Sequence, residues 1–138
     1  MIALDTNVLA RAIVEEAAAD SATRAQQQRA RALLSSGREL FVPLTVVQEL
    51  EWVLRSVYGM PAEDVALLFD DLLAVENIEV DRAAAVSQAV GWYRNGLDFS
   101  DALHLAQVGL CESLSSFDAG FVKLARRLRL KPPVSAPA

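Results

Sequence analysis

Cysteine is almost absent from this sequence, and long hydrophobic runs are absent altogether. Cys111 is the only cysteine, so the chain has no intrachain disulfide, and we expect this side chain to be buried like a small hydrophobic residue. No apolar run reaches the roughly 18 residues that a membrane-spanning helix needs. The N-terminus has no basic segment and carries Asp5 where a signal peptide would be apolar. We therefore expect a cytoplasmic protein that does not associate with a membrane.

Positive charge is also scarce, because 13 Lys and Arg stand against 18 Asp and Glu, a net charge of −5. A general nucleic-acid-binding protein is normally basic, so this balance argues against one. It does not exclude a nuclease, because cations bound to a carboxylate cluster would neutralise the charge locally. Five basic residues crowd the short stretch 123–131. This stretch either places favourable charge near a helix C-terminus or contacts phosphate or an acidic partner segment.

The chain length of 138 residues, 53% of them hydrophobic, fits one domain over residues 1–138, with a Pro-rich tail at 131–138. Apolar periodicity and turn residues predict alternating strands and helices. We expect strands at residues 2–4, 40–42, 78–80 and 113–117, and a short final strand within 130–134. We expect helices at residues 6–15, 19–36, 43–58, 81–94, 101–110 and 118–128, and one that begins at Pro61. This alternation predicts a three-layer α/β fold with a mainly parallel central sheet of four to five strands and about seven flanking helices.

Four aspartates lie near predicted helix starts, two of them directly after a strand. Asp5 and Asp118 each follow a predicted strand, at the edge where ligands bind in parallel sheets. Asp101 lies in the first turn of a predicted helix, and Asp98 comes three residues earlier. Asp is also a favoured N-cap, and first-turn acids interact well with the helix dipole. Each aspartate taken alone therefore suits either a helix cap or a functional site.

Glu49 differs from these aspartates because it lies in the middle of a predicted helix. Val46 and Val53 share its side of the helix, which places Glu49 within the expected apolar stripe. No Lys or Arg stands three or four residues away, so either a metal ion compensates its charge or the side chain is protonated or reaches solvent. Glu51, by contrast, is expected at the surface, paired with Arg55 at i+4.

Taken together, the carboxylates predict a metal site. Three or four carboxylates packed together repel each other unless a divalent cation lies among them. An all-oxygen set of ligands suits Mg²⁺ or Mn²⁺. Such a cation lowers the pKa of a bound water and stabilises charge on a phosphate group.

Four sequence motifs resemble those of PIN-domain ribonucleases, in the form common in VapC-type toxins. They are LDTNVL at residues 4–9, QEL at 48–50, DFSDALHLA at 98–106 and SFDAGF at 116–121. Their order and spacing match the family over nearly the whole chain. The resemblance implies a PIN-like fold and a metal-dependent endoribonuclease that hydrolyses phosphodiester bonds in single-stranded RNA with Mg²⁺ or Mn²⁺.

The resemblance also assigns roles to residues and implies partners. The acidic catalytic and metal-binding positions carry over to Asp5, Glu49, Asp101 and Asp118, with Asp98 as a further metal-binding acid. Polar positions that orient carboxylates or water carry over to Thr6, Asn7 and Ser116. The implied partners are the RNA substrate, a VapB-type antitoxin and a second copy of the chain in a homodimer.

Two other functions within the same family remain open at this point. One is a PIN nuclease of RNA processing that is not a toxin, and the other is an inactive PIN-fold binding module. A phosphotransfer protein is disfavoured, because phosphoaspartate hydrolases need a second aspartate two residues after the first, where this chain has Asn7. The presence of all four acidic motifs favours an active nuclease, and the single-domain length favours a toxin.

Overall fold

The computed structural model describes residues 1–15 and 20–138. The chain forms two compact units, unit 1 (Met1–Ala83) and unit 2 (Ala84–Ala138). Each unit is described separately below.

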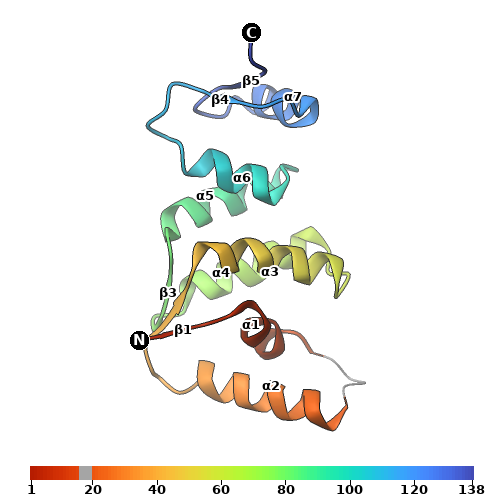
Figure 1. Cartoon of the computed structure of the whole chain (residues 1–138), viewed down its shortest axis with the longest axis vertical. Helices are drawn as coiled ribbons and strands as arrows, with labels where there is room; N and C mark the ends of the chain where they lie inside the picture. The colour runs from red at the N-terminus through yellow and green to blue at the C-terminus, as the bar shows by residue number, and fades with distance from the viewer. Residues whose placement is uncertain (16–19) are drawn as a thin grey trace. The chain divides into compact units, whose positions relative to one another are not determined.

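Unit 1 contains a three-stranded sheet and four helices among its described residues (Figure 1). Its elements in chain order are β1 (Ile2–Ala3), α1 (Thr6–Ile13), α2 (Ser21–Leu34), β2 (Leu40–Val42), α3 (Leu44–Ser56), α4 (Ala62–Ala74) and β3 (Ile78–Val80). The strand order is β1-β2-β3, and both neighbouring pairs are parallel, with Leu40 of β2 opposite Ile2 and Ile78. Two helices therefore connect each strand to the next, as parallel pairing requires.

Unit 2 contains three helices and a pair of short parallel strands. Its elements are α5 (Ala83–Arg94), which begins at the boundary with unit 1, α6 (Phe99–Ala106), β4 (Leu114–Ser115), α7 (Ala119–Arg127) and β5 (Val134–Ser135). Strand β4 pairs with β5 in parallel register. The rings of Tyr93 and Phe99 meet edge to face, with centroids 5.2 Å apart, and both residues are buried.

Local sequence signals explain where several helices begin. Pro43 and Pro61 stand at the N-caps of α3 and α4, both with φ near −61°, which suits a helix start. Gly59, at φ 65°, turns the chain between these two helices. Asp20 caps α2 by accepting a hydrogen bond of 2.7 Å from the backbone N–H of Thr23. The predicted start of that helix, Ala19, lies outside the described residues.

The core of unit 1 forms where its helices pack together and onto the sheet. Helix α1 packs against both α2 and α3 (Figure 1). The most deeply buried side chains include Leu9, Leu40, Leu54 and Phe69. Asp5 stands between β1 and α1, so the burial of Leu4 and Leu9 on either side fixes its place at the edge of the sheet.

The predicted α/β class, its parallel pairing and its seven helices are confirmed among the described residues. The predicted sheet of four to five strands is wrong, because three strands form one sheet and β4 pairs only with β5. These strands are two or three residues long, so an apolar run could predict that a strand exists but not which sheet it joins. The final strand is β5, which lies within the segment expected to be a tail.

Two further expectations are corrected. Cys111 is exposed, not buried, because it follows the end of α6 in a turn region of unit 2. Helix α6 begins at Phe99 with Asp98 as its N-cap, where the sequence suggested a start at Asp101 capped by Ser100. No helix of the described residues is long and apolar enough to cross a bilayer.

Candidate active site

In unit 1, Thr6 joins the two predicted carboxylates. Asp5 is the N-cap of α1, and its Oδ1 accepts a hydrogen bond of 2.8 Å from the backbone N–H of Thr6. The hydroxyl of the same threonine donates to Oε1 of Glu49 on α3. Thr6 is only 4% exposed, whereas Asp5 and Glu49 are exposed. Buried Thr6 therefore contacts two accessible carboxylates, Asp5 through its backbone N–H and Glu49 through its hydroxyl.

The predicted environments of the two glutamates on α3 are reversed. Glu51 is buried, at 4% exposed, and its Oε2 accepts from the Nε of Arg55 at 2.8 Å. Glu49 is exposed, so the apolar stripe does not include it. The buried side of α3 consists of Val47, Leu50, Glu51 and Leu54, at i, i+3, i+4 and i+7. The predicted pair with Arg55 is present, but its carboxylate is in the core.

A hollow of about 280 Å³ opens beside these carboxylates. Its lining includes Asp5, Asn7 and Glu49, together with two residues that sequence reasoning missed, Arg11 and Tyr58. The Nη1 of Arg11 donates to the hydroxyl of Tyr58 at 2.9 Å. Asn7 and Arg11 are four residues apart on α1 and so share one face, a spacing that could have pointed to Arg11.

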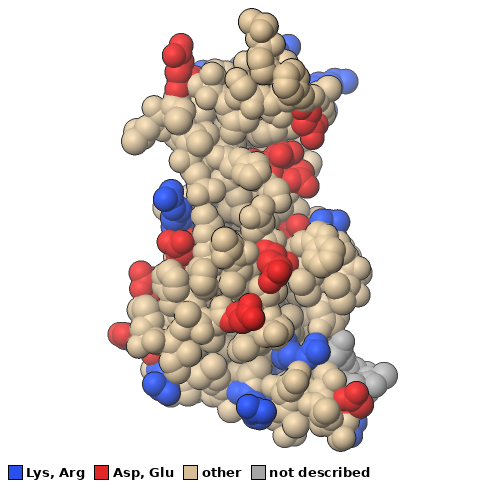
Figure 2. Space-filling view, viewed as in Figure 1, with Lys and Arg blue, Asp and Glu red and all other residues tan. Residues whose placement is uncertain are grey.

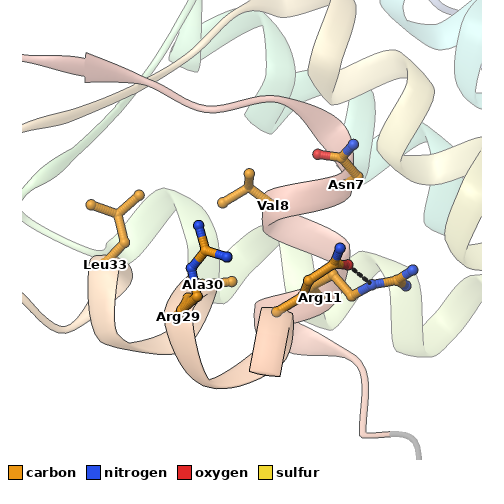
Figure 3. Close-up of a pocket in the computed structure, with 7 residues that line it drawn as sticks. Asn7, Val8, Arg11, Arg29, Ala30 and Leu33 are labelled. Atoms are coloured by element: carbon orange, nitrogen blue, oxygen red, sulfur yellow. Dashed lines mark hydrogen bonds between the residues drawn. The ribbon is translucent and has the colours of Figure 1, made fainter. Parts of the chain in front are cut away.

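A second hollow of about 380 Å³ lies between α1 and α2 (Figure 3). In this view Asn7 and Val8 of α1 stand across from Arg29 and Leu33 of α2. Asn7 and Arg11 line both hollows, so the two are adjacent. Basic side chains of unit 1 gather toward α2, at the bottom of Figure 2. Positive charge therefore lies next to the Asp5–Glu49 pair.

In unit 2, three predicted carboxylates lie at the starts of α6 and α7. Oδ1 of Asp98 accepts from the backbone N–H of Asp101 at 3.1 Å, and Oδ1 of Asp118 accepts from that of Phe121 at 3.0 Å. Both residues are therefore N-caps. Asp101 has no such capping role, because it lies in the first turn of α6.

The electrostatics of Asp101 show that these carboxylates are crowded. Partial burial raises the pKa of its carboxyl group, and the negative charges of Asp98 and Asp118 raise it further. The charge of His104, an exposed residue of α6, acts in the opposite direction on this pKa. The charges of Asp98 and Asp118 thus act on Asp101 within unit 2.

Ser116 and Gly120 set the position of Asp118. The Oγ of Ser116 accepts from the backbone N–H of Asp118 at 3.0 Å, so this serine restrains the backbone at Asp118. A Cβ at Gly120 would stand 3.3 Å from Oδ1 of Asp118, closer than an ordinary contact. Glycine therefore leaves room for the capping carboxylate. Nothing in the sequence pattern indicates this close approach.

The donor set fits a hard divalent cation by its chemistry. Each unit offers carboxylate oxygens with a hydroxyl group beside them, the ligand type that Mg²⁺ and Mn²⁺ prefer. Burial, and then the charges of Asp98 and Asp118, raise the pKa of Asp101, and a bound cation would favour its ionised form. Among residues 1–15 and 20–138, no three Asp, Glu, His or Cys side chains converge as a ready-made metal site.

The comparisons with known proteins identify a family for the chain. Neither the curated proteins nor the solved structures gave a match. The sequence profile described as "PIN domain" matches residues 2–130, nearly the whole chain. This match contains every acidic and polar residue of the candidate site: Asp5, Thr6, Asn7, Glu49, Asp98, Asp101, Ser116 and Asp118. The chain therefore belongs to the PIN-domain family.

Proposed function

We propose that this protein is an Mg²⁺- or Mn²⁺-dependent endoribonuclease that hydrolyses phosphodiester bonds in RNA. PIN domains are generally nucleases. The observation that carries the proposal is the placement of Asp98, Asp101 and Asp118 at the starts of α6 and α7, where burial, and then the charges of Asp98 and Asp118, raise the pKa of Asp101. A cation bound near these carboxylates would relieve their mutual repulsion.

We assign the carboxylates to metal binding and Thr6 to their orientation. Within unit 1 the metal ligands would be Asp5 and Glu49, and within unit 2 they would be Asp98, Asp101 and Asp118. When bound, Mg²⁺ or Mn²⁺ lowers the pKa of a water ligand and stabilises negative charge on the phosphate. Thr6 orients the two carboxylates of unit 1, since it donates to both.

The supporting polar groups fix the carboxylates without neutralising them. Ser116 accepts from the backbone N–H of Asp118, and the cap bond to Phe121 restrains the Asp118 carboxylate. Asn7 lines the hollow beside Asp5 and Glu49, where its amide can donate to a phosphate or to a water. These residues hold charge in place before substrate binds, which is the main way that enzymes stabilise charged transition states.

The experiment is cleavage of a labelled single-stranded RNA by purified protein with Mg²⁺ or Mn²⁺, and again in EDTA. We expect cleavage with the metal and none in EDTA. Asp101→Asn and Glu49→Gln should each abolish most of the activity, and Glu63→Gln, an exposed residue of α4, should keep it. Undiminished cleavage in EDTA would overturn the mechanism.

An inactive PIN-fold binding module is the second candidate, because Asp5, Asp98 and Asp118 all act as helix caps. Capping alone would explain these three aspartates without any catalysis. It does not explain Asp101 or Glu49, which cap nothing among the described residues. Absence of cleavage with every metal tested, in protein that is folded, would favour the binding module.

Within the nuclease proposal, we favour a toxin that is held inactive by a VapB-type antitoxin and forms a homodimer. The resemblance of the four acidic motifs to VapC-type toxins supports this role over RNA processing. Expression of the chain alone should then arrest growth, and expression of Asp101→Asn should not. Harmless expression of the intact, folded and cleavage-competent protein would favour a processing nuclease.

A further inference from the structure

A hollow of about 500 Å³ in unit 2 lies directly beside Asp118. Three segments build it: the residues after β4, one face of α7 and the residue after β5. The lining residues are Ser116, Phe117, Ala119, Val122, Lys123, Arg126, Arg127 and Ala136. Its basic residues come from one helix, where Arg126 and Arg127 stand three and four residues after Lys123 and so share its face.

The charge around this hollow is opposite to that of the chain as a whole. The chain has a net charge of −5, but residues 119–131 contain five Lys and Arg and no Asp or Glu. Unit 2 as a whole carries six basic and four acidic residues. A local surplus of positive charge in an acidic protein is what a site for a phosphate backbone requires.

Phe117 supplies an aromatic surface at the same place. Its side chain is 87% exposed, although it follows β4 and precedes a helix. The backbone on its C-terminal side is held by the bond from the Asp118 N–H to Ser116 Oγ, and the helix after it is capped by Asp118. A phenylalanine held at the surface beside three cations is suited to stacking on a base, because every base has a π-face.

We propose that this hollow binds single-stranded RNA, with one unpaired base stacked on Phe117 and neighbouring phosphates contacting Lys123, Arg126 and Arg127. The proposal rests on the proposed nuclease function, since it places the strand next to Asp118. It also gives a reason for a preference for single strands, because the bases of a duplex are stacked on each other and cannot stack on the ring.

A purely structural role explains only part of this surface. Arg126 and Arg127 lie in the last turn of α7, where positive charge suits the helix dipole. Lys123 lies in the middle of the helix, where the dipole offers it nothing, and all three cations line the hollow. The Phe117 side chain is largely exposed, so packing against the helix does not explain its position.

Binding of a fluorescent oligoribonucleotide, followed by anisotropy in EDTA, tests the proposal without any cleavage. Phe117→Ala should weaken binding about tenfold, since one stacked base contributes roughly 1–3 kcal/mol and 1.4 kcal/mol is a factor of ten. Phe117→Trp should retain the affinity. The matched control is Leu110→Ala, another fully exposed apolar residue of unit 2 that does not line the hollow.

The role of the basic side chains that line the hollow is tested through the salt dependence of RNA binding. Lys123→Gln should reduce the slope of log affinity against log salt by about 0.7, the value for one phosphate contact on a single strand. Arg129→Gln removes a charge from the same basic stretch but outside the hollow, so it should change the slope less. A duplex RNA of the same length should bind equally well to the wild type and to Phe117→Ala.

The outcomes separate this proposal from the proposed function. Equal RNA affinity of Phe117→Ala and wild type, in protein that cleaves RNA with Mg²⁺, overturns the RNA-binding hollow and leaves the nuclease intact. Phe117-dependent binding in protein that never cleaves overturns the nuclease and leaves the hollow. If Phe117→Ala weakens binding of an acidic peptide but not of RNA, the hollow is a protein-docking site and the proposal is wrong.

Discussion

Glu49 and Glu51 stand two residues apart on α3 and do different work. The carboxylate of Glu51 is buried and bonded to Arg55, so it is part of the structure of unit 1. That of Glu49 is exposed and bonded to Thr6, which also holds Asp5. A buried charge that keeps its partner is tolerated, whereas the same charge left alone is strongly destabilising. We therefore expect a change at Glu51 to affect stability and a change at Glu49 to affect function.

Replacement of each glutamate by glutamine should separate the two roles. Glu51→Gln weakens a bond to a charged donor in the core and should lower the free energy of unfolding by about 1–3 kcal/mol. Glu49→Gln should leave that free energy nearly unchanged and reduce RNA cleavage about 10²-fold, a loss of about 2.7 kcal/mol in the transition state. Urea denaturation and cleavage rates on the same preparations give both quantities.

A control variant and two contradicting outcomes belong to this comparison of Glu49→Gln with Glu51→Gln. Arg55→Gln serves as a control on the Glu51 result, because it should destabilise unit 1 while leaving the bond between Thr6 and Glu49 in place. If Glu49→Gln cleaves RNA as well as the wild type does, Glu49 does not belong to the active site. If it loses activity only to the extent that it unfolds, its role is structural.

Asp101 makes a prediction about pH that needs no metal. Burial and the charges of Asp98 and Asp118 raise the pKa of this carboxyl group in the folded protein above its value of about 3.9 in the unfolded chain. Ionisation of Asp101 therefore costs the folded state more than the unfolded state. The protonated form of Asp101 therefore contributes stability relative to the ionised form. That contribution is fully present below pH 3.9 and is lost as the pH rises through the folded-state pKa.

Asp101→Asn removes that loss, because the amide does not ionise. In EDTA, the unfolding free energy of the variant relative to wild type should increase as the pH is raised from about 3.9. It should level off once Asp101 is ionised in both states. Urea denaturation of the two proteins across this range provides the measurement. If the unfolding free energy of Asp101→Asn relative to wild type falls as the pH rises, the surroundings stabilise the ionised carboxylate. That result would contradict a raised pKa for Asp101.

At the scale of the elements, the start of α7 combines a helix cap with a proposed metal ligand. Asp118 caps the helix and is proposed to hold the metal, and Gly120 leaves the room that its carboxylate occupies. The helix itself would be better served by alanine, since glycine in a helix is about 0.8–1.0 kcal/mol less favourable. Stability and placement of the carboxylate thus favour different residues at position 120.

Gly120→Ala should therefore reduce activity without unfolding the protein. Its Cβ would stand 3.3 Å from Oδ1 of Asp118 and displace the carboxylate by a few tenths of an ångström. Since a misplacement of about 1 Å can cost roughly 10²-fold in rate, we expect a several-fold loss of cleavage. Gly91→Ala in α5 is the control, because its Cβ meets nothing within 4 Å; it should add about 0.5–1 kcal/mol of stability and leave cleavage unchanged.

The elements also show what sequence patterns can and cannot specify. Turn residues such as Pro43, Gly59 and Pro61 predicted helix boundaries well, because their backbone preferences act locally. Sheet membership depends on contacts between distant segments, and strands of two or three residues carry too little pattern to specify it. The same dependence on distant contacts explains why the sequence pattern assigned the wrong buried side to α3.

On α3, apolar residues occur on both sides of the helix. The predicted stripe contains Val46, Glu49 and Val53, whereas the buried side in the structure contains Glu51. A charged residue in a core face is unexpected from burial preferences alone. The spacing to Arg55 predicted the Glu51–Arg55 pair correctly but could not tell whether Glu51 lies at the surface or in the core. The choice of candidate site residues does not depend on which face is buried, because it rests on the order of the motifs.

At the scale of the molecule, the acidic residues are unevenly divided. Residues 1–83 carry 14 Asp and Glu against seven Lys and Arg, whereas residues 84–138 carry four against six. The two units therefore present opposite net charges to an RNA strand. Divalent cations should interact with each unit differently, because the Asp5–Glu49 pair stands in an acidic unit and Asp98, Asp101 and Asp118 stand in a basic one.

Thermal unfolding with and without Mn²⁺ tests metal binding by the whole chain independently of catalysis. A ligand that binds only the folded state stabilises it by about 2.7 kcal/mol at 100 times its Kd, so Mn²⁺ should raise the Tm of the wild type above that in NaCl of equal ionic strength. Glu49→Gln and Asp101→Asn should each reduce this rise, and the larger reduction identifies the unit whose carboxylates contribute more to binding. Glu63→Gln, which removes an exposed charge of α4, should preserve the rise. An equal rise in all four proteins would mean that Mn²⁺ binds elsewhere, and the metal-dependent mechanism would then lose its ligands.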